Sequence, residues 1–140
     1  MSTSRPGTGG RGGGKARGET DFQDWLKQAF DRTGSFTALI LLVRIGDLKV
    51  TPLASTFLNV IGEDVNWPQM AALLAGSGQP WDGAAFFPVT EADGPIGNAD
   101  ARARLRTLEA RVREDRLVLN EGHLFDLWGR RLKVEEETAH

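Results

Sequence analysis

The chain of 140 residues has no cysteine, no tyrosine, two histidines and no long apolar run. Without cysteine it can form no disulfide framework, no thiol nucleophile and no cysteine-ligated zinc or iron–sulfur site. The longest apolar run, FTALILLV at 36–43, is far shorter than the roughly 20 residues that cross a bilayer. No apolar segment of a secretory signal follows Met1. We therefore expect a cytoplasmic protein with no membrane attachment.

Charge is distributed unevenly along the chain, although the net charge is only −2. Residues 1–20 carry four basic side chains against one acidic side chain, whereas the remaining residues carry 13 basic and 18 acidic ones. A basic segment thus precedes an acidic one. Arginine outnumbers lysine 13 to 4, and Ala and Gly are abundant, which indicates a bacterial coding bias towards GC.

The first 19 residues are rich in glycine and contain no large apolar side chain after Met1. Such a segment cannot offset the entropy lost on ordering, so residues 1–19 are predicted to be a disordered basic tail. It is interpreted either as a flexible leader or as an arm that contacts phosphates. Residues 20–136 are long enough to form one domain with an ordinary core, and residues 137–140 are expected to fray.

Local patterns predict helices, strands and turns along residues 20–136. Apolar residues at helical spacing, with capping residues before them, predict helices at 20–33, 52–61, 67–75 and 98–116. Apolar and β-branched runs predict strands at 36–45, 48–51 and 84–89, and Pro88 places the last of these at an edge or an end. The segment LFDLWGRRLKVE, at 124–135, predicts a closing hairpin around Gly129 and Arg130.

These elements predict a single α+β domain of order α-β-β-α-α-β-α-β-β. Helices are expected to pack on one face of a small, mainly antiparallel sheet.

One stretch, NEGHLFDLWGRR at 120–131, contains residue types that are used in catalysis. Glu121, His123 and Asp126 could supply an acid, a base and an orienting group, and a His–Asp pair could act as a general base near neutral pH. The segment NEGH, at 120–123, also suits a turn that enters a hairpin, in which it would bond to the backbone with His123 partly buried against its neighbours. The structural interpretation is favoured, because neither a nucleophile elbow nor an H-E-x-x-H motif accompanies them.

Metal, cofactor and nucleotide sites are not predicted. Two histidines are too few for a typical zinc site, and the carboxylates do not follow the pattern of a calcium loop. The segment GTGGRGGGK superficially resembles a phosphate-binding loop, but no strand precedes it, and Ala16 stands where Ser or Thr is needed.

Nucleic-acid binding is an alternative that rests on the arginine-rich helix predicted at 98–116. Arg102, Arg106 and Arg113 fall on one flank of this helix and could contact a phosphate backbone together with the tail. Four acidic residues on the same helix reduce its net charge to +2, which is more typical of a solvated face. The short helix predicted at 67–75 has no basic side chain, which argues against sequence-specific recognition.

The four tryptophans offer another type of surface. Trp25 lies on an apolar helix stripe, whereas Trp67, Trp81 and Trp128 lie at element ends or in turns, where they could either plug the core or contact a partner. Because no catalytic or cofactor constellation is complete, the preferred hypothesis is a small non-enzymatic bacterial module that binds another protein. Auxiliary nucleic-acid binding comes second, and an enzyme that uses His123 comes third.

Overall fold

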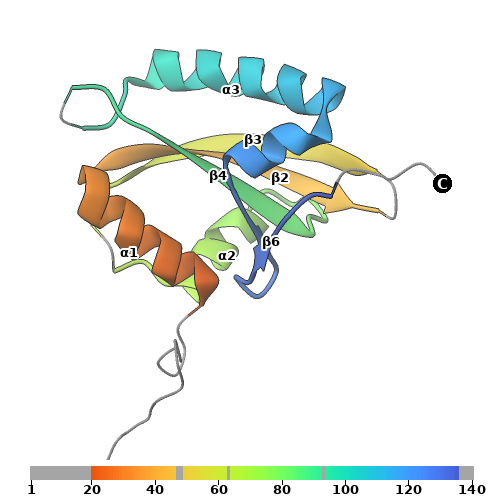
Figure 1. The fold of residues 1–140 in the computed structure, drawn as a ribbon, viewed down its shortest axis with the longest axis horizontal. Helices are drawn as coiled ribbons and strands as arrows, with labels where there is room; N and C mark the ends of the chain where they lie inside the picture. Colours follow the sequence, from red (N-terminus) through yellow and green to blue (C-terminus); the bar gives the residue numbers. More distant parts are fainter. Residues whose placement is uncertain (1–19, 47–48, 63, 93, 136–140) are drawn as a thin grey trace, which may run out of the picture.

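The structure, a computed structural model, describes residues 20–46, 49–62, 64–92 and 94–135 (Figure 1). The predicted tail at 1–19 and residues 136–140 lie outside these ranges. The elements in chain order are α1 (Asp21–Thr33), β2 (Phe36–Ile45), β3 (Val50–Val60), α2 (Trp67–Ala75), β4 (Gly83–Val89), α3 (Asn98–Glu114), the 3-10 helix η1 (Arg116–Glu121), β5 (His123–Asp126) and β6 (Arg131–Leu132). The strands form one sheet of order β3-β2-β4-β5-β6, in which every neighbouring pair is antiparallel. The predicted α+β class and antiparallel sheet are confirmed.

Strand β2 is the centre of the fold, because its first eight residues are all buried. Alternate side chains of a strand point to opposite faces, so β2 supplies two cores at once. Phe36, Ala38, Ile40 and Leu42 belong to the core under α1 and α2, which we call the α1/α2 core. The intervening Leu39, Leu41 and Val43 belong to a second core under α3, which we call the α3 core.

The expectation that all helices lie on one face of the sheet is therefore wrong. Helices α1 and α2 cover one face, and α3 covers the other (Figure 1). The continuous apolar run of β2 indicates that both faces are covered, because a strand with one solvent-exposed face alternates apolar and polar residues.

The helix predicted at 52–61 is also wrong, because residues 52–60 belong to β3. Leu53, Phe57 and Val60 do have helical spacing, but the segment pairs with β2 from Val50 to Val60 and satisfies that edge of the central strand. Pro52 is tolerated because β3 is an edge strand and because Pro52 lies next to a register shift. Tertiary pairing overrides the local pattern here.

Most of the predicted helix boundaries are found in the structure. Thr20 caps α1 by accepting a hydrogen bond from the N–H of Gln23 at 3.2 Å. Asn66 and Gln69 form a reciprocal capping box at the start of α2. Helix α3 begins at Asn98, as the predicted range does, but its N-cap is Gly97, which makes no side-chain capping bond.

The C-terminal part follows the predicted pattern more closely. Strands β5 and β6 form the predicted hairpin, although only two residue pairs join them. Pro88 lies where β4 extends past its last pairing with β5, which agrees with the edge position predicted for it. The 3-10 helix η1 was not predicted; it connects α3 to β5.

Thr37 is a fully buried polar residue that joins three segments across the sheet. Its hydroxyl donates a hydrogen bond to Asn59 Oδ1 at 2.8 Å and accepts one from the N–H of Ile96 at 3.0 Å. Ile96 belongs to the loop that leads into α3. This hydroxyl therefore holds β2, β3 and that loop in register.

We predict that Thr37→Val, which keeps the shape but removes the hydroxyl, lowers the free energy of unfolding by about 1 to 3 kcal/mol. The N–H of Ile96 would then be buried without an acceptor. Urea denaturation measures the loss, and Thr37→Ser, which keeps the hydroxyl, serves as the control. Equal stability of Thr37→Val and the wild type would show that this bond does not matter.

Candidate functional site

The three residues predicted as a catalytic group have different partners. Glu121 Oε2 accepts a hydrogen bond from Arg111 Nη2 at 2.8 Å. The carboxylate of Asp126 bonds to the turn that follows β5. His123 and Asp126 are three residues apart in one strand, so their side chains leave it on opposite faces. The structure does not assemble an acid, a base and an orienting group from these residues.

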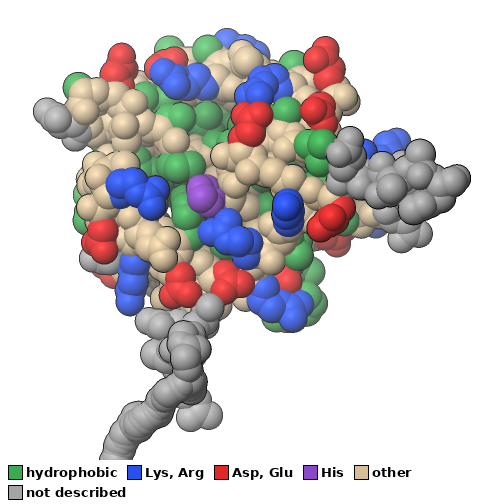
Figure 2. Space-filling model, viewed as in Figure 1, with side chains coloured by type: hydrophobic (Ala, Val, Ile, Leu, Met, Phe, Trp, Pro, Cys, Tyr) green, Lys and Arg blue, Asp and Glu red, His purple; other side chains and the backbone are tan. Residues whose placement is uncertain are grey.

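The imidazole of His123 packs against α1. Its ring stacks on Trp25 with 5.0 Å between centroids, and Nδ1 lies 3.2 Å from Arg131 Nη1. Burial lowers the pKa of His123 to about 4, and the positive charges of Arg131 and Arg32 contribute to this shift. Because arginine only donates, Nδ1 accepts and the ring is neutral at pH 7. Figure 2 shows this histidine in purple, with basic side chains in blue near it. A group with so low a pKa is a weak proton acceptor, which is unfavourable for a general base.

The tryptophans divide into core and surface residues. Trp25, Trp67 and Trp81 are buried in the α1/α2 core, and Trp67 and Trp81 meet edge to face. Trp67 and Trp81, two of the three tryptophans expected to contact a partner, are thus core residues, and neither ring is exposed in this structure. Trp128 differs, because 65% of its surface is exposed.

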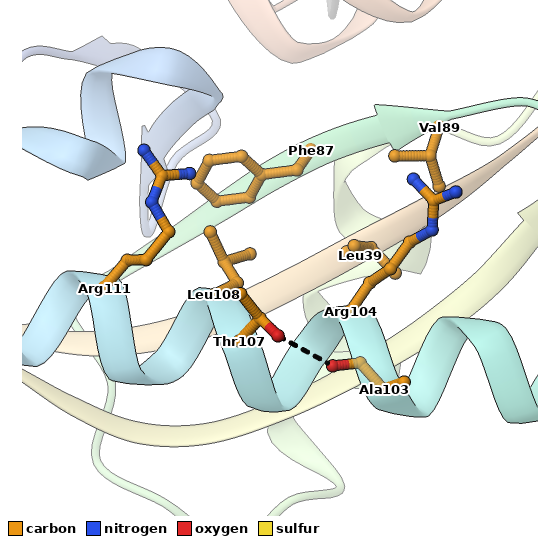
Figure 3. Close-up of a pocket in the computed structure, with 8 residues that line it drawn as sticks. All are labelled: Leu39, Phe87, Val89, Ala103, Arg104, Thr107, Leu108 and Arg111. Carbon is orange, nitrogen blue, oxygen red and sulfur yellow. Dashed lines mark hydrogen bonds between the residues drawn. The ribbon is translucent and has the colours of Figure 1, made fainter.

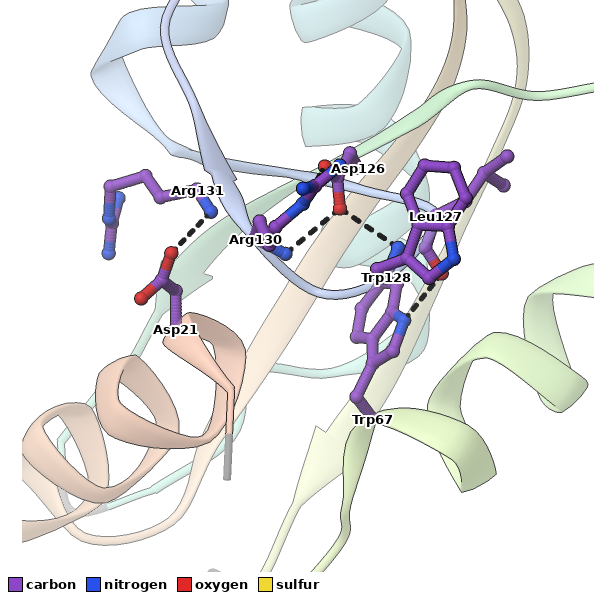
Figure 4. Close-up of polar contacts among 7 residues, drawn as sticks. All are labelled: Asp21, Trp67, Asp126, Leu127, Trp128, Arg130 and Arg131. Atoms are coloured by element: carbon purple, nitrogen blue, oxygen red, sulfur yellow. Dashed lines mark hydrogen bonds and ion pairs between the residues drawn. The ribbon is translucent and has the colours of Figure 1, made fainter. Parts of the chain in front are cut away.

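The turn between β5 and β6 is organised by Asp126 (Figure 4). Its carboxylate accepts hydrogen bonds from the N–H of Trp128 at 2.8 Å, from the N–H of Arg130 at 2.9 Å and from Nε of Arg130 at 2.8 Å. Its backbone N–H donates to the carbonyl of Arg130, and its carbonyl accepts from the N–H of Gly129. One nearly buried carboxylate thus fixes the whole turn.

The backbone carbonyls of this turn are hydrogen-bonded to the N-terminal ends of α1 and α2. Trp67, the first residue of α2, donates from Nε1 to the carbonyl of Leu127 at 2.8 Å. Phe22 in the first turn of α1 donates its N–H to the carbonyl of Gly129 at 3.0 Å. Gly129 has φ +78°, and a Cβ there would lie 2.7 Å from the ring of Trp67. Only glycine fits this contact without strain.

The exposed side chains of the turn form an apolar and cationic surface. Leu127 is 44% exposed and Trp128 is 65% exposed. The guanidinium group of Arg130 lies over the ring of Trp128, 5.0 Å from the ring centre. We call Leu127, Trp128 and Arg130 the turn patch.

The arginines proposed for nucleic-acid binding lie along α3 and share their surface with an acid. Arg102 lies over the ring of Phe57 at 5.8 Å, and Arg106 lines the same surface hollow beside β3 together with Glu109. Arg113 is exposed. One acidic side chain, Glu109, therefore lies among the three arginines of this flank, and mixed charges of this kind are typical of a solvated helix.

A groove of about 340 Å³ lies on the other flank of α3 (Figure 3). Its walls are apolar side chains from the sheet and from α3, including Leu39, Phe87 and Leu108. Arg104 and Arg111 reach over it, but Arg104 is paired with Asp100 at 3.1 Å and Arg111 with Glu121 at 2.8 Å. The groove can accept an apolar group, and its two cations are already balanced by acids.

The role of Asp126 in the turn and the groove beside α3 were both missed from the sequence. The segment DLWG did contain a signal, because Asp at the first position and Gly at the fourth position are typical of a type I turn. The groove had no local signal, since its walls come from three separate segments.

The depressed pKa of His123 predicts a pH dependence of stability. The unfolded ring titrates near its ordinary value of 6.5 and the folded ring at about 4, so the unfolded state binds more protons between these values. Stability is therefore full above pH 6.5 and is lost as the pH falls towards 4. We expect the wild type to lose about 1 kcal/mol more than His123→Gln between pH 7 and pH 5, after allowance for solvent screening. Urea titrations at both pH values test this, and parallel losses in the two proteins would contradict it.

Two tryptophan variants should separate the core from the turn patch. Trp81→Ala is expected to lower the free energy of unfolding by about 3 to 5 kcal/mol, because it leaves a cavity in the α1/α2 core. Trp128→Ala is expected to cost less than about 1 kcal/mol, because its ring is mostly exposed. Chemical denaturation of both variants measures the difference. A Trp128→Ala variant as unstable as Trp81→Ala would mean that the turn patch is structural.

Metal-binding groups and membrane-spanning helices are not found in the described parts of the chain. No cluster of three or more His, Cys, Asp or Glu residues there could hold a metal ion. No helix in these ranges is long and apolar enough to cross a membrane. Comparisons with protein-family models, with curated proteins and with solved structures found no match.

Proposed function

We propose that this protein is a non-enzymatic bacterial interaction module that acts in the cytoplasm and binds a partner protein through the turn patch. The main support for the proposal is that Trp128 is exposed on a turn whose backbone is held in place by hydrogen bonds. Tryptophan and arginine are the residues most enriched at the energetic centres of protein interfaces. Here the two lie in contact on one turn.

The rigidity of the turn favours binding, because little conformational entropy remains to be lost. The carboxylate of Asp126 accepts hydrogen bonds from N–H groups of the turn, and Trp67 and Phe22 donate hydrogen bonds to its carbonyls. A further bond joins the N–H of Arg131 to Asp21 Oδ2 at 2.8 Å (Figure 4). A preorganised contact converts more of its buried area into affinity than a flexible one.

The composition of the turn patch indicates the chemistry of its partner. Trp128 and Leu127 need an apolar pocket, and burying such side chains is worth about 1.5 to 3 kcal/mol each. Arg130 keeps 68% of its side chain exposed even though its Nε is bonded to Asp126. A carboxylate beside the pocket would therefore complement the guanidinium group.

The other two hypotheses have less support from the same contacts. His123 is neutral at pH 7, is bonded to Arg131 and is stacked on Trp25, so it has little capacity to act as a base. The flank of α3 proposed for nucleic acid carries Glu109 between its arginines. Neither surface combines exposure with a fixed geometry as the turn patch does.

The test is a quantitative affinity purification with the wild-type chain and Trp128→Ala, followed by binding assays with the purified partner. We expect Trp128→Ala to weaken the complex roughly 30-fold, which corresponds to a hot spot of about 2 kcal/mol. Ile45→Ala truncates another exposed apolar side chain, at the end of β2 and away from the turn patch, and is the control. It should bind like the wild type.

Two results would refute the turn patch as the contact. One is a specific partner that Trp128→Ala binds as tightly as the wild type. The other is a complex that Ile45→Ala and Trp128→Ala weaken equally, since that would indicate a general effect of lost apolar surface.

A further inference from the structure

Strand β3 is a long edge of the sheet, and its outer side has no neighbouring strand within the described residues. The strand runs from Val50 to Val60 and pairs with β2 on one side only. Its outer backbone groups therefore form a row of donors and acceptors that another strand can pair with.

The sequence of β3 does not protect this edge. Proteins usually shield an edge strand with charged side chains, proline or short length. The segment VTPLASTFLNV has no charged residue over its 11 positions, and its one proline, Pro52, lies near the start. The opposite edge of the sheet, β6, is only two residues long and includes Arg131. The two edges thus differ sharply in how easily they can pair.

Apolar surface continues from this edge onto the side covered by α2. Hollows of about 290 and 250 Å³ lie there, and Leu58 lines both of them. Leu73 borders the first hollow and is 59% exposed, and Ile61 borders the second and is 66% exposed. A strand added at β3 would cover part of this surface.

We propose that the outer edge of β3 pairs with β3 of a second copy of this chain, in antiparallel register with Thr56 on the two-fold axis. This register places Leu58 opposite Ala54 of the second copy, and Phe57 opposite Ser55. Each pair joins a large side chain with a small one, so the two copies fit without crowding.

On the α3 side of the edge, one acidic and one basic side chain meet in the same register. The hydroxyl of Ser55 donates a hydrogen bond to the carboxylate of Glu109, and Arg102 lies over the ring of Phe57. When Ser55 faces Phe57 of the second copy, Glu109 of one copy therefore lies towards Arg102 of the other. The two-fold axis repeats this pairing of opposite charges. A partner with an uncharged strand would lack this complementarity, which favours a second copy as the occupant.

Thr56→Lys tests the interface, because it places two positive charges opposite each other at the axis. Thr56 is exposed in one copy, so the substitution should leave the fold intact, and circular dichroism checks this. Light scattering coupled to size exclusion is expected to give a dimer for the wild type, and Thr56→Lys is expected to dissociate at least roughly tenfold more readily. Ala110→Lys adds the same charge to an exposed position of α3 and should remain a dimer.

Cross-linking tests the register, because the chain contains no cysteine of its own. Thr56→Cys should form a disulfide-linked dimer under mild oxidation, since facing residues of paired strands lie close to disulfide distance. Ala110→Cys is the control and should stay mainly unlinked. A monomeric wild type, or a dimer that Thr56→Lys leaves intact and Thr56→Cys does not cross-link, would overturn the proposal.

Discussion

The two-sided burial of β2 is the constraint on which the other elements depend. Its eight consecutive buried residues, 36–43, cannot be covered by helices on a single face. Helices α1 and α2 must therefore cover one face and α3 the other. The same burial demands strands on both sides of β2, since its backbone groups have no access to water, and β3 and β4 supply them. The helical spacing within β3 is overridden for this reason.

The turn between β5 and β6 is stable only because of its tertiary anchors. Two residue pairs between the strands are too few for an independent hairpin. The α1/α2 core supplies what is missing, because Trp67 both fills that core and donates a hydrogen bond to Leu127. Buried aromatic packing and the geometry of the exposed turn patch are thus coupled through one side chain. This coupling explains why the apolar side chains of the turn stay exposed to solvent.

Local chemistry in the sequence was sufficient for much of the fold. The caps at Thr20 and Asn66 define helix starts because their side chains bond to the nearest backbone groups. Gly34, with φ +71°, ends α1, as its place after an apolar stripe predicts. The closing hairpin and the edge position of Pro88 also follow from turn and proline chemistry. Each of these features depends on residues within a few positions of one another.

The sequence by itself determined the α+β class, most element boundaries and the single buried run at the centre. Tertiary structure decided which faces are covered, whether 52–61 is helix or strand, and which tryptophan is exposed. Trp67, Trp81 and Trp128 all lie at element ends, so local sequence cannot rank their burial, whereas packing buries the first two and leaves Trp128 outside. The tertiary structure also separates Glu121, His123 and Asp126, which are close in sequence. Each of their side chains forms its hydrogen bond with a different partner. Contacts between segments that are distant in sequence decide these features, and no local sequence pattern predicts them.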